Sequence, residues 1–269
     1  IGKAGDEVTV TVSLGNNTAL GNYTAALVYD EKALELVRKA IEINAQPMYS
    51  QLEGDILFAQ GKYADAFVSY EKVNQSPMAD ASTFYSAAKA KQMTEGSDIN
   101  EVLAIMDKAI EMLKKPYYGE AAPYFYERAE LRANAGKHRE AVMDYNTFFE
   151  AVHGDVTALF YFQREQAEMQ CRMYQQALND IDTAIYLDPQ NVSYYIEKGG
   201  LCYRVKLSDE GLRILTEAEA FAPDVADIYY LKGRLFVQKG DRESARSCLE
   251  KALEFGHPDA GAVLELLKK

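Results

Sequence analysis

The chain has 269 residues, of which 48% are hydrophobic and 26% charged, so it can build a folded body. Its 41 Asp and Glu against 29 Lys and Arg give a formal net charge of −12. That charge repels phosphate backbones and anionic lipids, so we expect no nucleic-acid partner. The apolar runs are far shorter than the roughly 20 residues that cross a bilayer, and the sequence does not open like a signal peptide. We therefore expect a soluble chain that does not insert into a membrane.

The first thirty residues have a period of two. Residues 8–14 alternate apolar with hydroxyl side chains, residues 23–29 alternate again, and Gly15-Asn16-Asn17 forms a turn signal between them. This pattern predicts a short β segment over 1–30, a strand pair or part of an incomplete module, that leans on the first helices or on another chain. In the alternative interpretation the second stretch is a helix, with an apolar stripe of Leu20, Tyr23, Ala26 and Leu27.

Helical spacing of apolar residues begins at Glu31 and continues to Ile41. A longer pattern then returns near the C-terminus, in frames that start at Ala158, Val192 and Ala226. Their spacing is constant, since 192 − 158 = 34 and 226 − 192 = 34. Each frame has a tyrosine at its fourth position: Tyr161, Tyr195 and Tyr229. A fixed period of this length indicates stacked supersecondary units.

Small residues recur at two further positions of the frame. Position 20 holds Ala177, Gly211 and Ala245, and position 27 holds Ala184, Ala218 and Ala252. Proline follows near position 32, where it ends a helix because it lacks an amide donor. The period and these positions resemble the tetratricopeptide repeat family, with Tyr in place of the family's Trp.

The resemblance implies an all-α fold, a right-handed superhelical solenoid of antiparallel helix pairs. Earlier frames start at Pro47, Ala81 and Ala122, which makes about six full units over 47–257 within a solenoid of residues 31–269. The helix from Glu31 is then a cap at one end. A short helix after Pro258, with Val263, Leu264 and Leu267 facing inward, is the cap at the other end.

Residues 4–36 also resemble the opening strands of cohesin-type β-sandwich modules. The run from Ala4-Gly5-Asp6 through Tyr29-Asp30 to Leu34-Glu35-Leu36 carries this likeness. Most of such a module is missing here, so no cohesin function follows from it.

Signals of catalysis or cofactor binding are lacking in the sequence. There is no glycine-rich phosphate loop and no GxSxG motif, and no Ser or Cys has a His placed to activate it. The histidines do not share a helical face, and the cysteines, which we expect to be small buried hydrophobes, form no CxxC pair. These residues are His138, His153 and His257, and Cys171, Cys202 and Cys248. We expect no enzyme, no metal and no cofactor.

The family resemblance implies a ligand-facing concave surface at positions 2, 5, 6, 9, 12 and 13 of each first helix. Aromatic residues fill position 5 in four of the six units: Tyr85, Tyr126, Phe162 and Tyr230. Nearby acidic residues favour a ligand with basic groups: Asp55, Glu127, Glu130 and Glu197. The family members that grip C-terminal carboxylates carry Lys, Asn and Arg where this chain has aromatics, acids and Ser86, so a chaperone-tail clamp is not expected.

These observations predict a non-catalytic interaction scaffold, a monomer, that binds a protein or peptide in an aromatic groove of mixed charge. Two alternatives stay open. The position-5 rings could be packing alone, or the chain could be a structural protein that self-associates as a dimer, or docks, through its N-terminal strand edge. A third class, an enzyme or carbohydrate binder, is disfavoured because nothing polar converges on the groove. The sequence does not fix the compartment, and an extracytoplasmic location, the bacterial periplasm or cell envelope, is favoured over the cytoplasm.

Overall fold

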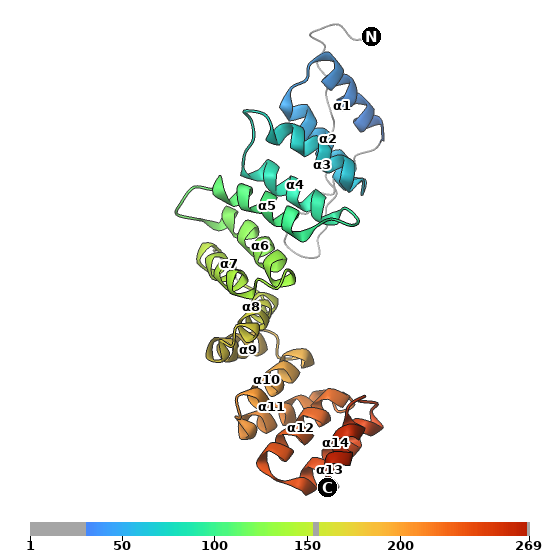
Figure 1. The fold of residues 1–269 in the computed structure, drawn as a ribbon, viewed down its shortest axis with the longest axis vertical. Helices are drawn as coiled ribbons and strands as arrows, with labels where there is room; N and C mark the ends of the chain where they lie inside the picture. Colours follow the sequence, from blue (N-terminus) through green and yellow to red (C-terminus); the bar gives the residue numbers. More distant parts are fainter. Residues whose placement is uncertain (1–30, 153–155, 268–269) are drawn as a thin grey trace. The chain divides into compact units, whose positions relative to one another are not determined.

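A computed structural model describes residues 31–152 and 156–267 (Figure 1). Within those ranges the chain forms fourteen α-helices and one 3-10 helix, and no strand. The fold of the described residues is therefore all-α, as predicted. The β segment predicted over 1–30 and the cohesin-like run before Glu31 lie outside the described residues.

The described chain divides into two compact units, with the boundary inside helix α7. The first unit holds residues up to 137 together with 144–152, and the second holds 138–143 with the residues from 153 on. The helices up to α7 are α1 (Glu31–Ile43), α2 (Pro47–Ala59), α3 (Tyr63–Asn74), α4 (Ala81–Met93), α5 (Ile99–Glu111), the 3-10 helix η1 (Gly119–Ala121), α6 (Ala122–Asn134) and α7 (His138–Ala151). The later helices are α8 (Ala158–Gln170), α9 (Tyr174–Leu187), α10 (Val192–Arg204), α11 (Ser208–Phe221), α12 (Ala226–Lys239), α13 (Arg242–Glu254) and α14 (Ala260–Leu267).

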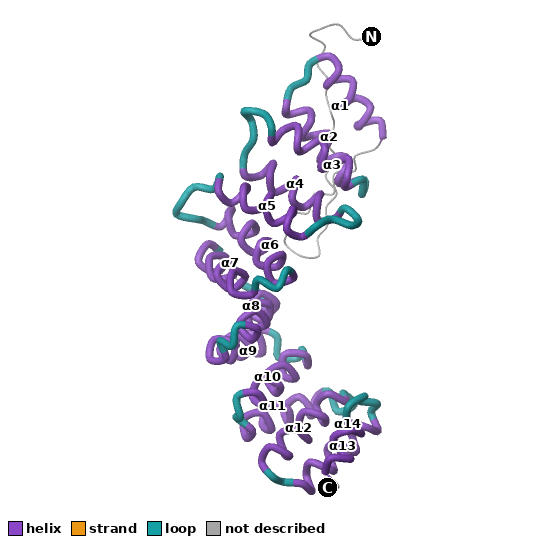
Figure 2. Tube along the Cα trace, viewed as in Figure 1, coloured by secondary structure: helices purple, strands orange, loops and turns teal. Residues whose placement is uncertain are grey.

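The helices are arranged in consecutive pairs joined by short turns (Figure 2). Each of the six predicted frames begins at the first residue of a helix: α2, α4, α6, α8, α10 and α12. The predicted cap helices are present as α1 and α14. In α14 the predicted inner stripe is confirmed, since Leu267 is buried and Val263 and Leu264 pack against the core that contains Tyr229.

Close approach within each pair depends on small side chains. All six alanines and glycines predicted at positions 20 and 27 are buried. At position 8 of the first helix, a Cβ built on Gly199 would lie 2.7 Å from Leu215 Cδ2, and one on Gly233 would lie 2.6 Å from Leu249 Cγ. The second helix therefore occupies the space that a side chain would need.

Two of the fourth-position tyrosines anchor their helix pair to the loop that precedes it. Tyr195 and Tyr229 are buried, and their hydroxyls donate to the backbone carbonyls of Pro189 at 3.0 Å and Pro223 at 2.7 Å. The prediction of a core position is confirmed for these two tyrosines. Tyr161, at the same position of α8, is only half-buried, so the uniform core column expected from the period is wrong at this unit.

Within each pair, the turn between the helices places one residue in the left-handed region. Four units use glycine there, namely Gly61, Gly96, Gly136 and Gly240, with φ between 73° and 80°. The units that begin with α8 and α10 instead have Arg172 at φ 59° and Lys206 at φ 63°. Side chains with a Cβ are strained in this region, so these two turns are held by the packing of their flanking helices.

Candidate protein-binding face

The residues at positions 2, 5, 6, 9, 12 and 13 of the first helices are called the first-helix face below. Three first helices contribute in each compact unit: α2, α4 and α6 in the first, and α8, α10 and α12 in the second. The two faces are described separately.

The four predicted position-5 rings, Tyr85, Tyr126, Phe162 and Tyr230, are all half-buried. Two of them pack on a ring at position 3 of the next first helix. The ring centroids of Tyr85 and Tyr124 are 4.7 Å apart, and those of Phe162 and Tyr194 are 5.0 Å apart. Each of these two contacts therefore joins neighbouring repeats, and part of the position-5 ring stays accessible.

The other two position-5 rings are held differently. Tyr126 lies against Phe148 of the second helix in its own pair, with centroids 5.6 Å apart. Tyr230 stacks on His257, at 3.8 Å and an interplanar angle of 13°. His257 is buried in the loop before α14, and its Nδ1 accepts from the Asp259 amide at 3.1 Å. These contacts therefore restrict the rotamers of both rings before any ligand arrives.

Three of the four predicted acidic site residues have partners inside the chain. Asp55 accepts from the Tyr70 hydroxyl at 2.8 Å, and burial raises the pKa of its carboxyl despite that bond. Glu127 pairs with Lys89 at 2.8 Å, and Glu130 accepts from the Tyr145 hydroxyl. These carboxylates are thus engaged in intramolecular contacts.

The fourth acid, Glu197 on α10, belongs to a different environment. Burial raises the pKa of its carboxyl and Arg204 opposes that shift. Glu165 on α8 is fully buried, and neither of its carboxyl oxygens has a hydrogen-bond partner in the described residues. Burial, with like charge from Glu197, Glu168 and Asp180, raises the pKa of Glu165 to about 8. In this part of the second unit, ionisation of the Glu165 and Glu197 carboxyl groups is therefore unfavourable.

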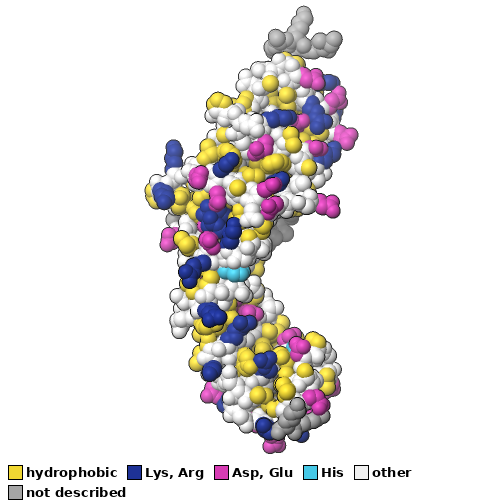
Figure 3. Space-filling view, in the orientation of Figure 1, with side chains coloured by type: hydrophobic (Ala, Val, Ile, Leu, Met, Phe, Trp, Pro, Cys, Tyr) yellow, Lys and Arg dark blue, Asp and Glu magenta, His cyan; other side chains and the backbone are white. Residues whose placement is uncertain are grey.

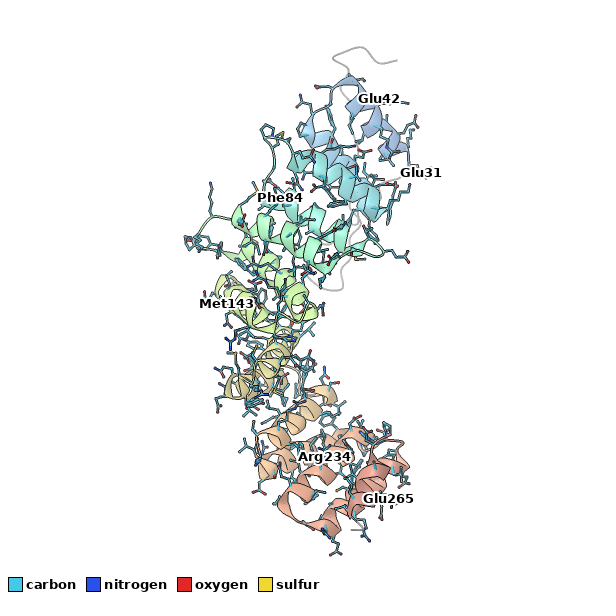
Figure 4. The ribbon with its side chains drawn as sticks, viewed as in Figure 1. Glu31, Glu42, Phe84, Met143, Arg234 and Glu265 are labelled. Atoms are coloured by element: carbon cyan, nitrogen blue, oxygen red, sulfur yellow. The ribbon has the colours of Figure 1, made fainter. Side chains whose placement is uncertain are left out.

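Arg234 is the basic residue at position 9 of α12 (Figure 4). One of its terminal nitrogens donates to the Tyr230 hydroxyl at 2.8 Å, and the other donates to the Tyr203 hydroxyl at 2.7 Å. The guanidinium carbon lies 4.5 Å from the centroid of the Tyr203 ring and 5.6 Å from that of Tyr230. Two tyrosines on neighbouring first helices therefore fix the orientation of this cation.

The rest of the described surface offers little other chemistry. Among residues 31–152 and 156–267, no group of three or more His, Cys, Asp or Glu is arranged to hold a metal ion. Nor does any helix in these ranges have the length and apolar character needed to span a membrane. Cys202 is buried as predicted, whereas Cys171 and Cys248 are half-buried. On the face drawn in Figure 3, acidic and basic side chains are interspersed with apolar ones.

Residues 226–255, which form the pair α12 and α13, match the family model of the tetratricopeptide repeat. This helix pair is a tetratricopeptide repeat. No curated protein matches the sequence of the chain.

Three solved structures share the fold at low identity. The C-terminal part of a repeat-containing protein from Cytophaga hutchinsonii aligns with a TM-score of 0.63 at 13% identity, covering 87% of this chain and 93% of that one. A tetratricopeptide repeat protein from Parabacteroides merdae aligns at 0.52 and 16% identity, covering 89% and 92%. MamA 41-end from Desulfovibrio magneticus RS-1 aligns at 0.50 and 20% identity, covering 56% and 85%. At these identities the likeness establishes the fold alone.

Sequence reasoning missed several residues that interact with side chains of the first-helix face. Tyr124 and Tyr194 both stand at position 3, so comparing that column between units would have indicated a second set of rings. Glu165 stands at position 8, where the other five units have Gly54, Ala88, Ala129, Gly199 and Gly233. The stacking of His257 on Tyr230 had no signal in the repeat, because His257 lies after the last full frame.

Proposed function

We propose that the chain as a whole is a tetratricopeptide repeat protein, a non-catalytic scaffold that binds a protein or peptide on its first-helix faces. The observation that carries the proposal is the set of half-buried rings at position 5, in both compact units. Each ring packs against a neighbouring side chain and keeps part of its surface accessible.

Rings held in this way are suited to bind a partner. An aromatic side chain buries a large area and loses little conformational entropy, and less still when its rotamer is already fixed. A small number of such anchors supplies most of the binding free energy of an interface. The packing of these rings and their use as anchors are compatible, since each ring is only half-buried.

Two finer features belong to the same proposal. The repeats over 31–269 would continue as one right-handed solenoid, whose concave surface contains the first-helix faces. The surface would be aromatic with mixed charge. The preference for a basic ligand, expected from the sequence, is not carried forward, because Asp55, Glu127 and Glu130 already have intramolecular partners.

The test is a selection of binding peptides from a random 12-residue library, followed by affinity measurements on variants. Tyr126→Ala and Phe162→Ala remove rings of the first and second unit. Tyr186→Ala is the matched control, because that ring lies on the second helix α9 and is 83% exposed.

We expect loss of at least one position-5 ring to weaken binding of the selected peptides by about 2 kcal/mol or more, while Tyr186→Ala leaves the affinity unchanged. Binding that is insensitive to both position-5 rings would contradict the proposal. Failure to recover any peptide or protein partner would contradict it as well.

A further inference from the structure

Among the described residues, one buried or half-buried Lys or Arg side chain lacks a carboxylate partner. Eight Lys and Arg side chains in residues 31–152 and 156–267 are buried or half-buried. Seven of them have a carboxylate oxygen within 3 Å: Lys89, Lys91, Arg128, Arg132, Arg164, Lys198 and Lys232. The eighth, Arg234, has no carboxylate partner in these ranges.

Withdrawing a cation from water is unfavourable unless an anion or several acceptors compensate it. Arg234 has two neutral acceptors, the Tyr203 and Tyr230 hydroxyls, and the faces of the same two rings. Two of its five N–H donors are used in these bonds, and the other three have no hydrogen-bond partner within residues 31–152 and 156–267. The side chain is therefore oriented but not neutralised.

The surroundings of Arg234 reinforce its orientation. The Tyr230 ring is fixed by stacking on His257, and the Tyr203 backbone carbonyl accepts from the Gln238 side chain at 3.1 Å. On the neighbouring helix α10, position 9 is Gly200, where an added Cβ would meet no atom within 4 Å. Space is thus left on the face at the same level of the repeat.

We propose that Arg234, held between Tyr203 and Tyr230, is a receptor for a carboxylate of the bound peptide. The ligand group is an Asp or Glu side chain or a C-terminal carboxylate. It would take up the free donors of the guanidinium in a charge-assisted, bidentate geometry, which neutral groups match poorly. This inference rests on the proposed function and specifies its partner as a peptide that carries a carboxylate at one fixed position.

The experiment uses peptides selected on the full chain, synthesised in three forms. One is the free acid, one has an amidated C-terminus, and one has each Asp or Glu changed to Asn or Gln. Their Kd values are measured on the wild type, on Arg234→Gln and on Tyr203→Phe. Arg246→Gln is the matched control, because Arg246 is exposed on the second helix α13. Melting curves and circular dichroism establish that each variant is folded.

We expect Arg234→Gln to weaken binding about tenfold or more and Arg246→Gln to have no effect. Tyr203→Phe, which keeps the ring and removes one hydroxyl, should weaken binding less. One of the two carboxylate changes should weaken wild-type binding to a similar degree and have no further effect on Arg234→Gln, which identifies the source of the carboxylate. Should Arg234→Gln fail to fold, the loss on Tyr203→Phe and its coupling to the same carboxylate decide the question.

Two results would overturn the inference, and they are distinguishable. Peptides that bind through the position-5 rings, but with equal affinity to wild type and Arg234→Gln and without dependence on a carboxylate, would refute it and leave the proposed function standing. Selection that recovers no peptide on any of the proteins would refute the proposed function and this inference together.

Discussion

The adjacent glycines Gly199 and Gly200 on α10 have opposite surroundings. A Cβ on Gly199 would lie 2.7 Å from Leu215 Cδ2, whereas one on Gly200 would meet nothing within 4 Å. We expect Gly200→Ala to raise the free energy of unfolding by about 0.5–1 kcal/mol, the gain of replacing glycine in a helix. Gly199→Ala should lower it by about 1 kcal/mol, because overpacking exceeds that gain. Chemical denaturation of both variants measures the difference, and equal effects would show that the helix pair does not close at position 8.

The two sets of rings on the first helices should differ in what their loss costs. Tyr195 and Tyr229 are 6% and 3% exposed and hydrogen bonded, so truncation to Ala should lower the free energy of unfolding by about 3–5 kcal/mol. Tyr126 and Phe162 are half-buried, so Tyr126→Ala and Phe162→Ala should lower it by about 1 kcal/mol. Melting curves on the four variants test this ordering. Equal destabilisation of the two sets would mean that the position-5 rings serve packing alone.

At the residue scale, the sequence was informative wherever the repeat fixes a position. The alanines and glycines at positions 20 and 27 are buried as predicted, because the period alone brings them to the contact between paired helices. Side-chain pairing was not predictable. Whether Glu127 faces solvent or Lys89 depends on contacts between different repeats, which the pattern of one repeat does not contain.

Among the elements, the turn before α11 carries local strain. Lys206 has φ 63°, where the equivalent residue of the last pair is Gly240 at φ 80°. Lys206→Gly should therefore raise the free energy of unfolding by about 1 kcal/mol, since glycine adopts this conformation without a Cβ clash. The reciprocal change Gly240→Lys should lower it by a similar amount. The result is read from denaturation midpoints, and a loss of stability in Lys206→Gly would mean that its side chain contributes contacts that outweigh the strain.

The Glu165 carboxyl group on helix α8 should make the stability of the folded protein depend on pH. The pKa of Glu165 is raised to about 8 by burial, from an ordinary value of 4.5. Because the folded state favours the protonated form, this group stabilises the fold fully below pH 4.5, and that contribution is lost as the pH rises through about 8. Between pH 5.5 and pH 8.5, the free energy of unfolding of the wild type should fall by about 1–3 kcal/mol more than that of Glu165→Ala.

The measurement for Glu165→Ala is urea denaturation at the two pH values. Glu254→Ala is the control, because Glu254 is exposed near the end of α13 and its removal should leave the pH dependence unchanged. A pH dependence that is the same in Glu165→Ala and the wild type would show that another group is responsible.

The boundaries of the repeat elements followed from the sequence almost residue by residue. Pro47, Ala122 and Val192 begin helices as predicted, because the frame is set by the spacing of small and aromatic residues that pack the pairs. The half-burial of Tyr161 at a core position of α8 was not foreseen. The repeat pattern describes what the units have in common, so it does not indicate where one unit differs from the others.

At the scale of the whole molecule, a repeat protein has no central cavity in which to place a site. Each pair buries its apolar stripe against its neighbours, and the contact of Phe162 with Tyr194 shows a first-helix ring taking part in that packing. Function is then expected on the surface that the first helices share. The central claim is that this surface, rather than the second helices or the N-terminal thirty residues, receives the partner.

Hydrogen exchange of the full chain, with and without a saturating selected peptide, tests that claim most directly. We predict increased protection in the first helices of at least one compact unit, with α10 and α12 protected when the peptide carries the carboxylate that Arg234 binds. The second helices α9, α11 and α13 should change little. Protection confined to second helices, or to residues 1–30, would contradict the account.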